Sequence, residues 1–426
     1  MSPWIRIVLL NMVFLGMWSL SHAEISKLDQ LNLIKVRLGQ SHQLSEKLTL
    51  QGKQIRVIEP FVLRKNILKQ YDRLTVFNEK NQWHLVFNNE ETFTVSAGRL
   101  NIQGEDLSFQ GKRLTPSIFI QKNKDKLDIV SELDVEKYLL GVLPSEMPAG
   151  WPIEALKAQV IASRTYALYT AQKKRSQTFH LESTVFDQVF RAGYFKRLTR
   201  PIQDKVKKAI EETKGLVLTH RGQLMPSYYH ADCGGQTEEP YLVWPGEGKN
   251  GTVKDPYCPL SPHGHWTVSY SKEQLFEKLK SKWSLDQSWH LKNISITKKS
   301  SSKRILQMKI SFQSGLRLRS FYTSAHDLRR LVGFNKLKST LFNVQILENK
   351  VVFHGQGHGH GVGMCQWGAR SLALRGIPFY EILNHYYPTG QLAMWPSKKL
   401  IARFENQSKK DWFKFFNLKD KSSSQM

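Results

Sequence analysis

Cysteine is scarce in this chain of 426 residues, which contains only three. Three cysteines are too few for a scaffold held together by disulfides. Acidic residues are also under-represented, because 36 Asp and Glu stand against 62 Lys and Arg, which gives a formal net charge of +26. This balance predicts an anionic partner, which can be nucleic acid, anionic lipid or an acidic polymer of the cell surface.

Long apolar runs are absent from the sequence after the first 23 residues. There, Arg6 precedes an apolar stretch over 7–20, which is shorter than the roughly 20 residues that span a bilayer. Small residues at Ser21 and Ala23 fit a peptidase site, so we predict a secretory signal peptide over 1–23. An uncleaved membrane anchor is the alternative. In both cases the rest of the chain is expected outside the cytoplasm, periplasmic or associated with the cell wall, and its charge then favours an envelope polymer over nucleic acid.

Length and patterning predict an α+β fold of mixed sheets and a few helices, in two or three domains. Residues 24–126 alternate apolar with polar positions in short stretches, so we predict a β-rich N-terminal module there. A second domain is expected over 127–397, followed by a basic tail over 398–426. Helices are predicted over 153–174, 201–214 and 366–374, and strands over 216–219, within 294–313 and over 351–353.

One carboxylate stands between two prolines, in the segment Leu143-Pro144-Ser145-Glu146-Met147-Pro148. Prolines stiffen the backbone, so we predict a rigid loop that holds Glu146. If apolar neighbours bury this carboxylate, desolvation raises its pKa, as a general acid acting on a glycosidic oxygen requires. A solvated loop glutamate without a catalytic role is the alternative.

Arg164 interrupts the apolar face of the helix predicted over 153–174, since it lies four residues after Val160 and four before Leu168. An arginine in that position either extends its charged end to solvent or meets an acidic partner.

Two of the cysteines, Cys233 and Cys258, occur in a segment that also contains His230. Cysteines of an exported protein commonly pair, so we predict a disulfide between Cys233 and Cys258. Zinc held by His230, Cys233 and Cys258 is the alternative, although the spacing matches no common zinc pattern. A Cys–His nucleophile is a further hypothesis, for which no positioned base can be named. Apart from this zinc alternative, no cofactor is predicted.

A segment rich in glycine and histidine, over 354–369, follows a predicted strand and precedes a predicted helix. It contains neither G-x-G-x-x-G nor a G-K-[ST] ending, which excludes these two phosphate-binding signatures. Its histidines, His354, His358 and His360, can bind a metal or donate hydrogen bonds to a sugar. The glycine density favours a binding surface on which a polymer lies close to the backbone, and a tight turn with packed histidines is the alternative.

Taken together, these segments resemble the sporulation stage II protein D / LytB (SpoIID-like) family of peptidoglycan-active proteins. The resemblance extends from about residue 127 to residue 392 and leaves the N-terminal module outside. Cys365 occupies a position that is often serine in the family, and Phe190 one that is usually tyrosine. The matching motifs lie over 135–142, 146–148, 155–159, 162–167, 187–190, 234–238, the glycine- and histidine-rich segment and 381–388.

The resemblance implies a lytic transglycosylase that cleaves peptidoglycan glycan strands to 1,6-anhydromuramic ends, with Glu146 as the catalytic glutamate. A non-catalytic peptidoglycan-binding protein that stimulates a cell-wall amidase is the alternative. A zinc-dependent wall hydrolase using His354, His358 and His360 is a third hypothesis, which rests on the residues alone. The candidate substrate-binding residues are Arg164, Tyr166, Asp187, Gln188, His358, His360 and Gln366.

Overall fold

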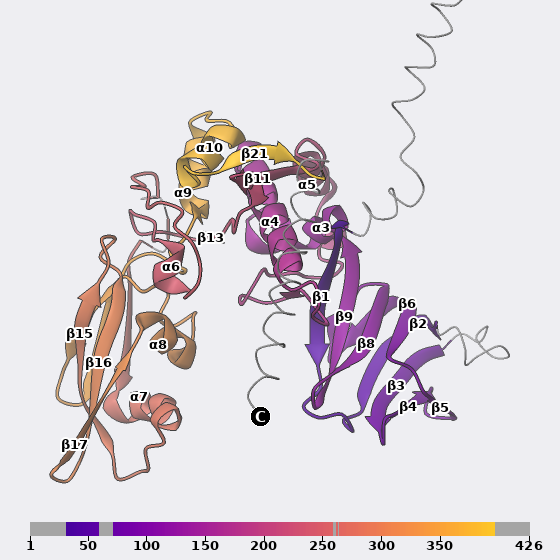
Figure 1. The fold of residues 1–426 in the computed structure, drawn as a ribbon, viewed down its shortest axis with the longest axis horizontal. Helices are drawn as coiled ribbons and strands as arrows, with labels where there is room; N and C mark the ends of the chain where they lie inside the picture. The colour runs from indigo at the N-terminus through magenta and orange to yellow at the C-terminus, as the bar shows by residue number, and fades with distance from the viewer. Residues whose placement is uncertain (1–30, 59–70, 259–260, 263, 397–426) are drawn as a thin grey trace, which may run out of the picture. The chain divides into compact units, whose positions relative to one another are not determined.

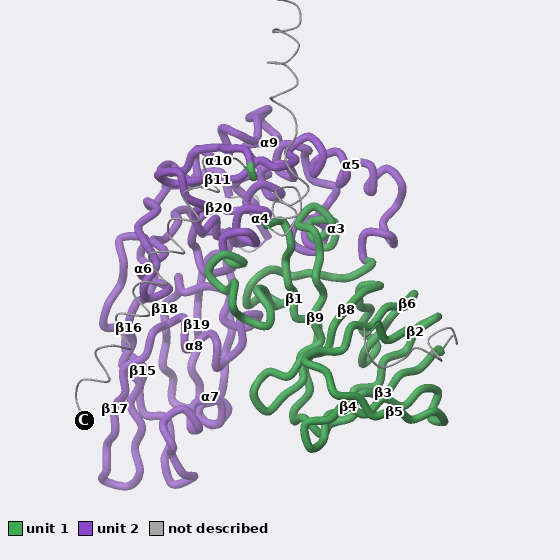
Figure 2. Tube along the Cα trace, turned by 45° about the vertical axis from the view of Figure 1, so that its right-hand side comes forward, with its two compact units in different colours: residues 1–141, 170–193, 395–426 green, residues 142–169, 194–394 purple. Residues whose placement is uncertain are grey.

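The computed structural model describes residues 31–58, 71–258, 261–262 and 264–396, and these residues have an α+β fold, as predicted (Figure 1). The predicted signal peptide and basic tail lie outside the described residues. The described chain forms two compact units, shown in different colours in Figure 2. Unit 1 contains the residues up to 141, together with 170–193 and 395–396, and unit 2 contains 142–169 and 194–394. Within the described ranges, no helix combines the length and the hydropathy needed to cross a bilayer.

The helices of the described chain are α3 (Val135–Glu146), α4 (Ile153–Lys173), α5 (Arg200–Glu211), α6 (Pro240–Val243), α7 (Lys272–Leu279), α8 (Ala325–Val332), α9 (Gln366–Leu374) and α10 (Phe379–Tyr386), with 3₁₀ turns η1 (Phe195–Arg197) and η2 (Lys280–Trp283). The strands up to residue 182 are β1 (Leu33–Gln40), β2 (Leu48–Val57), β3 (Tyr71–Glu79), β4 (Gln82–Phe87), β5 (Glu91–Val95), β6 (Arg99–Phe109), β7 (Lys112–Arg113), β8 (Ser117–Asn123), β9 (Lys126–Asp134) and β10 (Leu181–Glu182). The later strands are β11 (Leu216–His220), β12 (Gln223–Leu224), β13 (Tyr229–His230), β14 (Trp266–Ser271), β15 (His290–Lys299), β16 (Ile305–Ser314), β17 (Arg317–Thr323), β18 (Phe342–Ile346), β19 (Lys350–Gly355), β20 (Met364–Cys365) and β21 (Gln391–Met394).

Unit 1 is built on one sheet, in the strand order β10-β1-β9-β8-β6-β2-β3-β4-β5, with β7 paired to β6. Neighbouring strands are antiparallel, except that β10 pairs with β1 in parallel. Strand β4 shows the alternation that builds the core, because Trp83, Leu85 and Phe87 are buried while Gln82 is exposed. The β-rich N-terminal module is therefore confirmed, and its sheet also takes in β9 and β10, which lie beyond the predicted boundary at residue 126.

The long helix α4, which belongs to unit 2 up to Tyr169, is buried on most of its sides rather than on a single stripe. Its apolar residues Leu156, Val160 and Leu168 are buried as predicted, and the polar residues between them are buried as well. Those polar side chains form internal hydrogen bonds, as buried polar groups must. Thr165, for example, donates to the carbonyl of Ile161 at 2.7 Å and accepts from the N–H of Leu218, in β11, at 2.9 Å.

Within unit 2, residues 266–353 form sheets and helices that pack around a core of their own. Two three-stranded sheets, β14-β19-β18 and β15-β16-β17, share one hydrophobic core with α7 and α8. Figure 1 labels β15, β16 and β17 with the two helices in this part of the chain. Helix α7 packs against β15, and α8 packs against β16. The two strands predicted within 294–313 are β15 and β16, which form an antiparallel pair.

Candidate functional site

Glu146 is the last residue of helix α3, not part of a loop as the flanking prolines had predicted. Pro144 lies in the last turn of this helix, where its missing N–H deprives only one carbonyl of its helical partner. The turn therefore persists for two more residues, and the N–H of Met147 still donates to the carbonyl of Leu143 at 3.0 Å. The Glu146 residue is half-buried, and it is followed by buried Met147 and exposed Pro148.

The backbone at Glu146 is fixed by a residue from a distant part of the chain. Nε2 of Gln366, the first residue of α9, donates to the carbonyl oxygen of Glu146 and to Oε1 of Gln159, both at 3.1 Å. Gln159 in turn donates from Nε2 to Oγ of Ser163 at 2.9 Å. Gln366 is only 7% exposed, so its amide is committed to this internal chain of hydrogen bonds.

Arg164 is fully buried, so the alternative in which it extends to solvent is wrong. Its Nη1 donates to the carbonyl oxygen of Leu216, at the start of β11, at 3.2 Å. The guanidinium group thereby ties α4 to the sheet β12-β11-β21 inside unit 2. This interaction helps to explain why a charged side chain can occupy an apolar helix, because it gives one donor of the guanidinium an internal backbone partner.

Tyr166 begins a row of half-buried aromatic rings. Its ring lies 5.6 Å from that of Tyr228, which stacks on Trp244 at a centroid distance of 4.4 Å. The Trp244 ring meets that of His360 edge to face at 4.9 Å. All four residues keep part of their surface exposed. Such a row can offer apolar ring faces to a sugar while its polar edges remain hydrated.

The aromatic row is linked to Glu146 through one short strand pair. Strand β13 pairs in parallel with β20, with Tyr229 opposite Met364 and His230 opposite Cys365. Strand β20 runs directly into α9, whose first residue, Gln366, holds the Glu146 carbonyl. The segment that carries Tyr228 therefore lies beside the segment that positions Glu146.

Two histidines, His360 in this row and His230 beside it, are held in the neutral form. Nδ1 of His230 lies 3.0 Å from the carbonyl of Val362, and burial together with the nearby Arg304 lowers the pKa of His230 to about 3. Burial, with His230 and His326 close by, also holds the pKa of His360 well below its usual value. His360 accepts a hydrogen bond on Nδ1 from the N–H of Val362 at 3.0 Å. Neutral imidazoles can exchange hydrogen bonds with hydroxyl groups without attracting anions.

The glycines of the histidine-rich segment make room for the protein itself. A Cβ at Gly363 would come within 2.0 Å of the carbonyl oxygen of Tyr228, and one at Gly361 within 2.4 Å of the Arg304 guanidinium. Both glycines also have positive φ angles, +70° and +84°. Packing within the protein therefore explains these glycines, as the alternative of a tight turn with packed side chains requires, and contact of this segment with a polymer stays a prediction.

His358 pairs through its backbone with Asp232, since each N–H donates to the other's carbonyl at 2.8–2.9 Å. His354 is exposed, and its Nδ1 lies 3.1 Å from Oγ1 of Thr267. Among the described residues, one set of side chains has the proximity that metal binding needs, and it contains none of His354, His358 and His360. The zinc-hydrolase hypothesis therefore finds no support in their placement.

Asp187 and Gln188 belong to unit 1, and both have partners within it. Oδ2 of Asp187 accepts from the N–H of Glu182 at 2.8 Å and lies 3.7 Å from Nζ of Lys174. Gln188 is fully buried and accepts from the hydroxyl of Tyr138 at 3.0 Å. Their predicted contact with substrate stays a prediction.

The cysteines converge, although in a set that sequence analysis did not foresee. Cys233 and Cys258 lie close together, as both hypotheses for them require, but all three cysteines are free thiols in the structure. Cys365 joins the pair, whereas His230 is not part of the group. No spacing along the chain could have indicated Cys365, because it lies more than a hundred residues from its partners.

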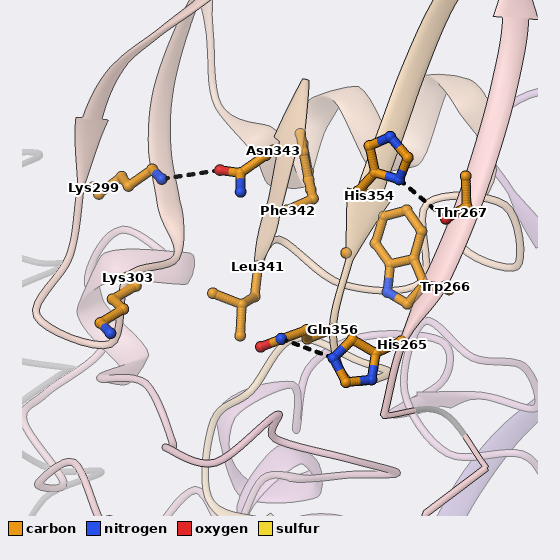
Figure 3. A pocket seen from close by; sticks show the side chains of 11 residues that line it. His265, Trp266, Thr267, Lys299, Lys303, Leu341, Phe342, Asn343, His354 and Gln356 are labelled. Atoms are coloured by element: carbon orange, nitrogen blue, oxygen red, sulfur yellow. Dashed lines mark hydrogen bonds between the residues drawn. The ribbon is translucent and has the colours of Figure 1, made fainter. Parts of the chain in front are cut away.

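An open hollow of about 370 Å³ lies in the sheet β14-β19-β18, as Figure 3 shows. Nζ of Lys299 donates to Oδ1 of Asn343 at 3.4 Å on one side, and Gln356 meets His265 at 3.1 Å on the other. Sequence reasoning missed this hollow because separate segments supply its walls. The lining residues are His265, Trp266, Thr267, Lys299, Lys303, Leu341, Phe342, Asn343, His354, Gly355 and Gln356.

Two family models match the sequence: that of the stage II sporulation protein, SpoIID, over residues 123–220, and that of a domain of unknown function, DUF8618, over 261–363. An uncharacterized protein of Brachyspira hyodysenteriae is 30% identical over 282 residues, which cover 63% of this chain and 69% of that protein. The chain belongs to the SpoIID-like family.

Two further relatives of this SpoIID-like chain come from Bacillus subtilis. Its stage II sporulation protein D is 28% identical over 274 residues, which cover 62% of this chain and 76% of that protein. Its amidase enhancer is 28% identical over 375 residues, covering 72% of this chain but only 50% of the enhancer. The SpoIID match contains Glu146, Arg164 and Tyr166, whereas His358 and His360 fall within the DUF8618 match.

Proposed function

We propose that this chain is an exported lytic transglycosylase that cleaves peptidoglycan glycan strands and leaves 1,6-anhydromuramic ends. The observation that carries the proposal is the position of Glu146. This half-buried residue ends helix α3, and Gln366 fixes its backbone from the first turn of α9. A catalytic acid needs such a fixed position, because proton transfer requires hydrogen-bond distance to the leaving oxygen. Membership of the SpoIID-like family supports the assignment.

The reaction needs one carboxyl group. Protonated Glu146 donates its proton to the glycosidic oxygen that leaves the muramic residue, and the bond from that oxygen to C1 breaks. The C6 hydroxyl of the same residue then forms a bond to C1, and the Glu146 carboxylate accepts its proton. The products are a 1,6-anhydro end and a free hydroxyl on the departing sugar, and no water is consumed. Because the nucleophile belongs to the substrate, it is already close to the reacting carbon.

The aromatic row supplies the binding surface in this proposal. The ring surfaces of Tyr228 and Trp244 that lie outside their mutual stack pack against the apolar faces of sugars, and the neutral His360 exchanges hydrogen bonds with hydroxyl or N-acetyl groups. The net charge of +26 attracts the anionic strand, so binding to the wall weakens as salt concentration rises.

Arg164 and Gln366 take positioning roles in this mechanism. Both were candidates for substrate binding, but Arg164 is fully buried and Gln366 is 7% exposed. Arg164 holds the carbonyl of Leu216, and Gln366 holds that of Glu146. Each therefore acts on the reaction through the backbone that it fixes.

The test is product analysis on purified sacculi, both intact and after an amidase has removed the stem peptides. The full chain is compared with Glu146→Gln and with Glu211→Gln, which changes an exposed glutamate at the end of α5. We expect mass spectrometry to find 1,6-anhydromuropeptides with the wild type and Glu211→Gln. With Glu146→Gln, release falls by about 1000-fold while binding to pelleted sacculi persists. Normal release by Glu146→Gln refutes the assignment.

A second function is favoured by the similarity to an amidase enhancer over 375 residues. In that case the chain binds peptidoglycan, releases no anhydro product alone and raises the rate at which a cell-wall amidase liberates stem peptides. Glu146→Gln then stimulates the amidase as well as the wild type does. Adding a purified amidase to the assay above separates the two functions.

A further inference from the structure

All three cysteines of the chain meet at one buried point of unit 2. Cys233 follows β13, Cys258 follows α6, and Cys365 is the N-cap of α9. Sγ of Cys233 lies 3.6 Å from Sγ of Cys258. One potential ligand atom from each cysteine and from Asp232 lies within 4.8 Å of all the others. Each of the four residues is at most 7% exposed.

Backbone N–H groups point at the sulfur atoms. The N–H of Cys233 and that of Gly368 each donate to Sγ of Cys365 at 3.4 Å, and the N–H of Gly235 donates to Sγ of Cys233 at 3.3 Å. Hydrogen bonds of this kind, and the N-terminus of a helix such as α9, stabilise a thiolate relative to a thiol. The surroundings of these sulfurs therefore suit anionic metal ligands.

Asp232 has one carboxylate oxygen that the protein leaves without a donor. Its Oδ1 accepts from the N–H of Gly234 at 2.7 Å, whereas its buried Oδ2 has no hydrogen bond among the residues that the structure describes. Burying such an oxygen without a partner costs free energy. A cation bound among the three sulfurs would supply that partner.

A buried arginine supplies the compensating charge. Arg304 is 1% exposed, and its Nη2 donates to the carbonyl of Cys233. Its Nε and Nη1 make no hydrogen bond within the described part of the chain, so neither atom is paired with an acidic side chain. Three thiolates and one carboxylate around a divalent ion leave two net negative charges, and the neighbouring guanidinium offsets one of them. The absence of a side chain at Gly361 leaves the space that this guanidinium occupies.

We propose that Cys233, Cys258, Cys365 and Asp232 bind one zinc ion. Zn–S bonds of about 2.3 Å in a tetrahedron place two sulfurs about 3.8 Å apart, close to the 3.6 Å between Cys233 and Cys258. A disulfide requires about 2.05 Å and leaves Cys365 without a role. Three soft thiolates favour zinc over magnesium or calcium, which prefer oxygen ligands.

The zinc has a structural role in this proposal. Four protein ligands leave no open position for water or substrate, as is typical of structural zinc sites. The ion joins three segments that are distant in sequence, and Cys365 is followed directly by Gln366, which fixes the Glu146 carbonyl. The site therefore stabilises the start of α9, and its existence does not depend on the reaction proposed for Glu146.

The experiment measures metal and thiols in the full chain purified after export, so that an oxidising compartment has had the chance to form a disulfide. We expect about one zinc per chain by inductively coupled plasma mass spectrometry and three thiols by titration after denaturation with a chelator. Replacement of zinc by Co²⁺ is expected to give thiolate charge-transfer bands and the intense visible bands of tetrahedral cobalt. One thiol per chain and no zinc overturns the proposal in favour of the Cys233–Cys258 disulfide.

Two variants identify the ligands. Cys365→Ser is expected to lower zinc content and to remove part of the charge-transfer intensity in the cobalt form. His230→Gln is the matched control, because this buried neighbour uses Nδ1 for the Val362 carbonyl, and we expect it to retain zinc. Loss of zinc in His230→Gln with retention in Cys365→Ser overturns the ligand set. If Cys365→Ser does not fold, the cobalt spectrum of the wild type still decides the number of thiolates.

Discussion

The side-chain amide of Gln366 donates to the backbone carbonyl of Glu146 at 3.1 Å, although the two residues are 220 positions apart in the chain. The same nitrogen donates to Gln159, and Gln159 donates to Ser163. The position of the proposed acid is thus determined jointly by α3, α4 and α9. A substitution that shifts any of these three helices is therefore expected to move the Glu146 backbone and to slow the reaction.

Gln366→Ala is expected to lower kcat for anhydromuropeptide release by about tenfold or more, since a misplaced acid transfers its proton less efficiently. KM should change little, because Gln366 does not contact the sugar in this proposal. The assay follows release from sacculi at several substrate concentrations. Gln345→Ala, at an exposed position of β18, is the control and is expected to behave as wild type. A rise in KM with unchanged kcat would instead assign Gln366 to substrate binding.

Arg164→Met is expected to lower the free energy of unfolding by about 3 kcal/mol. It removes a fully buried donor and leaves the carbonyl of Leu216 without this partner. Urea titration followed by circular dichroism measures the effect. The control is Arg330→Met, at an exposed position of α8, for which we expect a change within about 0.5 kcal/mol. Equal stability of the two variants contradicts the structural role of Arg164.

Acid is expected to destabilise unit 2 through its buried histidines. The folded pKa of His230 is about 3, below the unfolded value of about 6.5, so the unfolded state binds the proton first as pH falls. The contribution of His230 is therefore fully present above about pH 6.5. It is lost between that pH and about pH 3, with a slope of up to about 1.4 kcal/mol per pH unit.

Urea unfolding at pH 7.5 and pH 5 tests this dependence. His230→Gln has no proton to gain at this position, so its stability is expected to fall less between the two pH values than that of the wild type. His290→Gln, at an exposed position of β15, serves as control. Identical pH dependence of wild type and His230→Gln is the outcome that contradicts this assignment.

Local patterns predicted the elements well where local chemistry determines them. The helix predicted over 366–374 corresponds to α9, and that over 153–174 differs from α4 by one residue at its end. Apolar periodicity and helix-terminus signals lie within such segments and can be read without knowledge of the fold. The same reasoning misjudged Pro144, because a proline in a last helical turn costs only one hydrogen bond and did not end α3 before Glu146.

The parts of the site that depend on distant contacts could not be predicted. Nothing in the sequence near Gln366 indicates that its amide would meet Glu146, and nothing near Cys365 indicates two further cysteines. Likewise, the glycines at 361 and 363 are explained by Arg304 and Tyr228, which pack against them in the fold. Only tertiary structure distinguishes a turn of this kind from a surface that receives a ligand.

Strand β10 completes the sheet of unit 1 from a segment that interrupts the sequence of unit 2. Trp395 likewise donates to Asn32 at 3.1 Å, although the whole of unit 2 separates them in the sequence. No single cut of the polypeptide can therefore yield both units whole. Truncation after residue 126 would deprive the remaining β-rich piece of two strands, so the sheet of the first unit depends on residues well beyond its N-terminal segment.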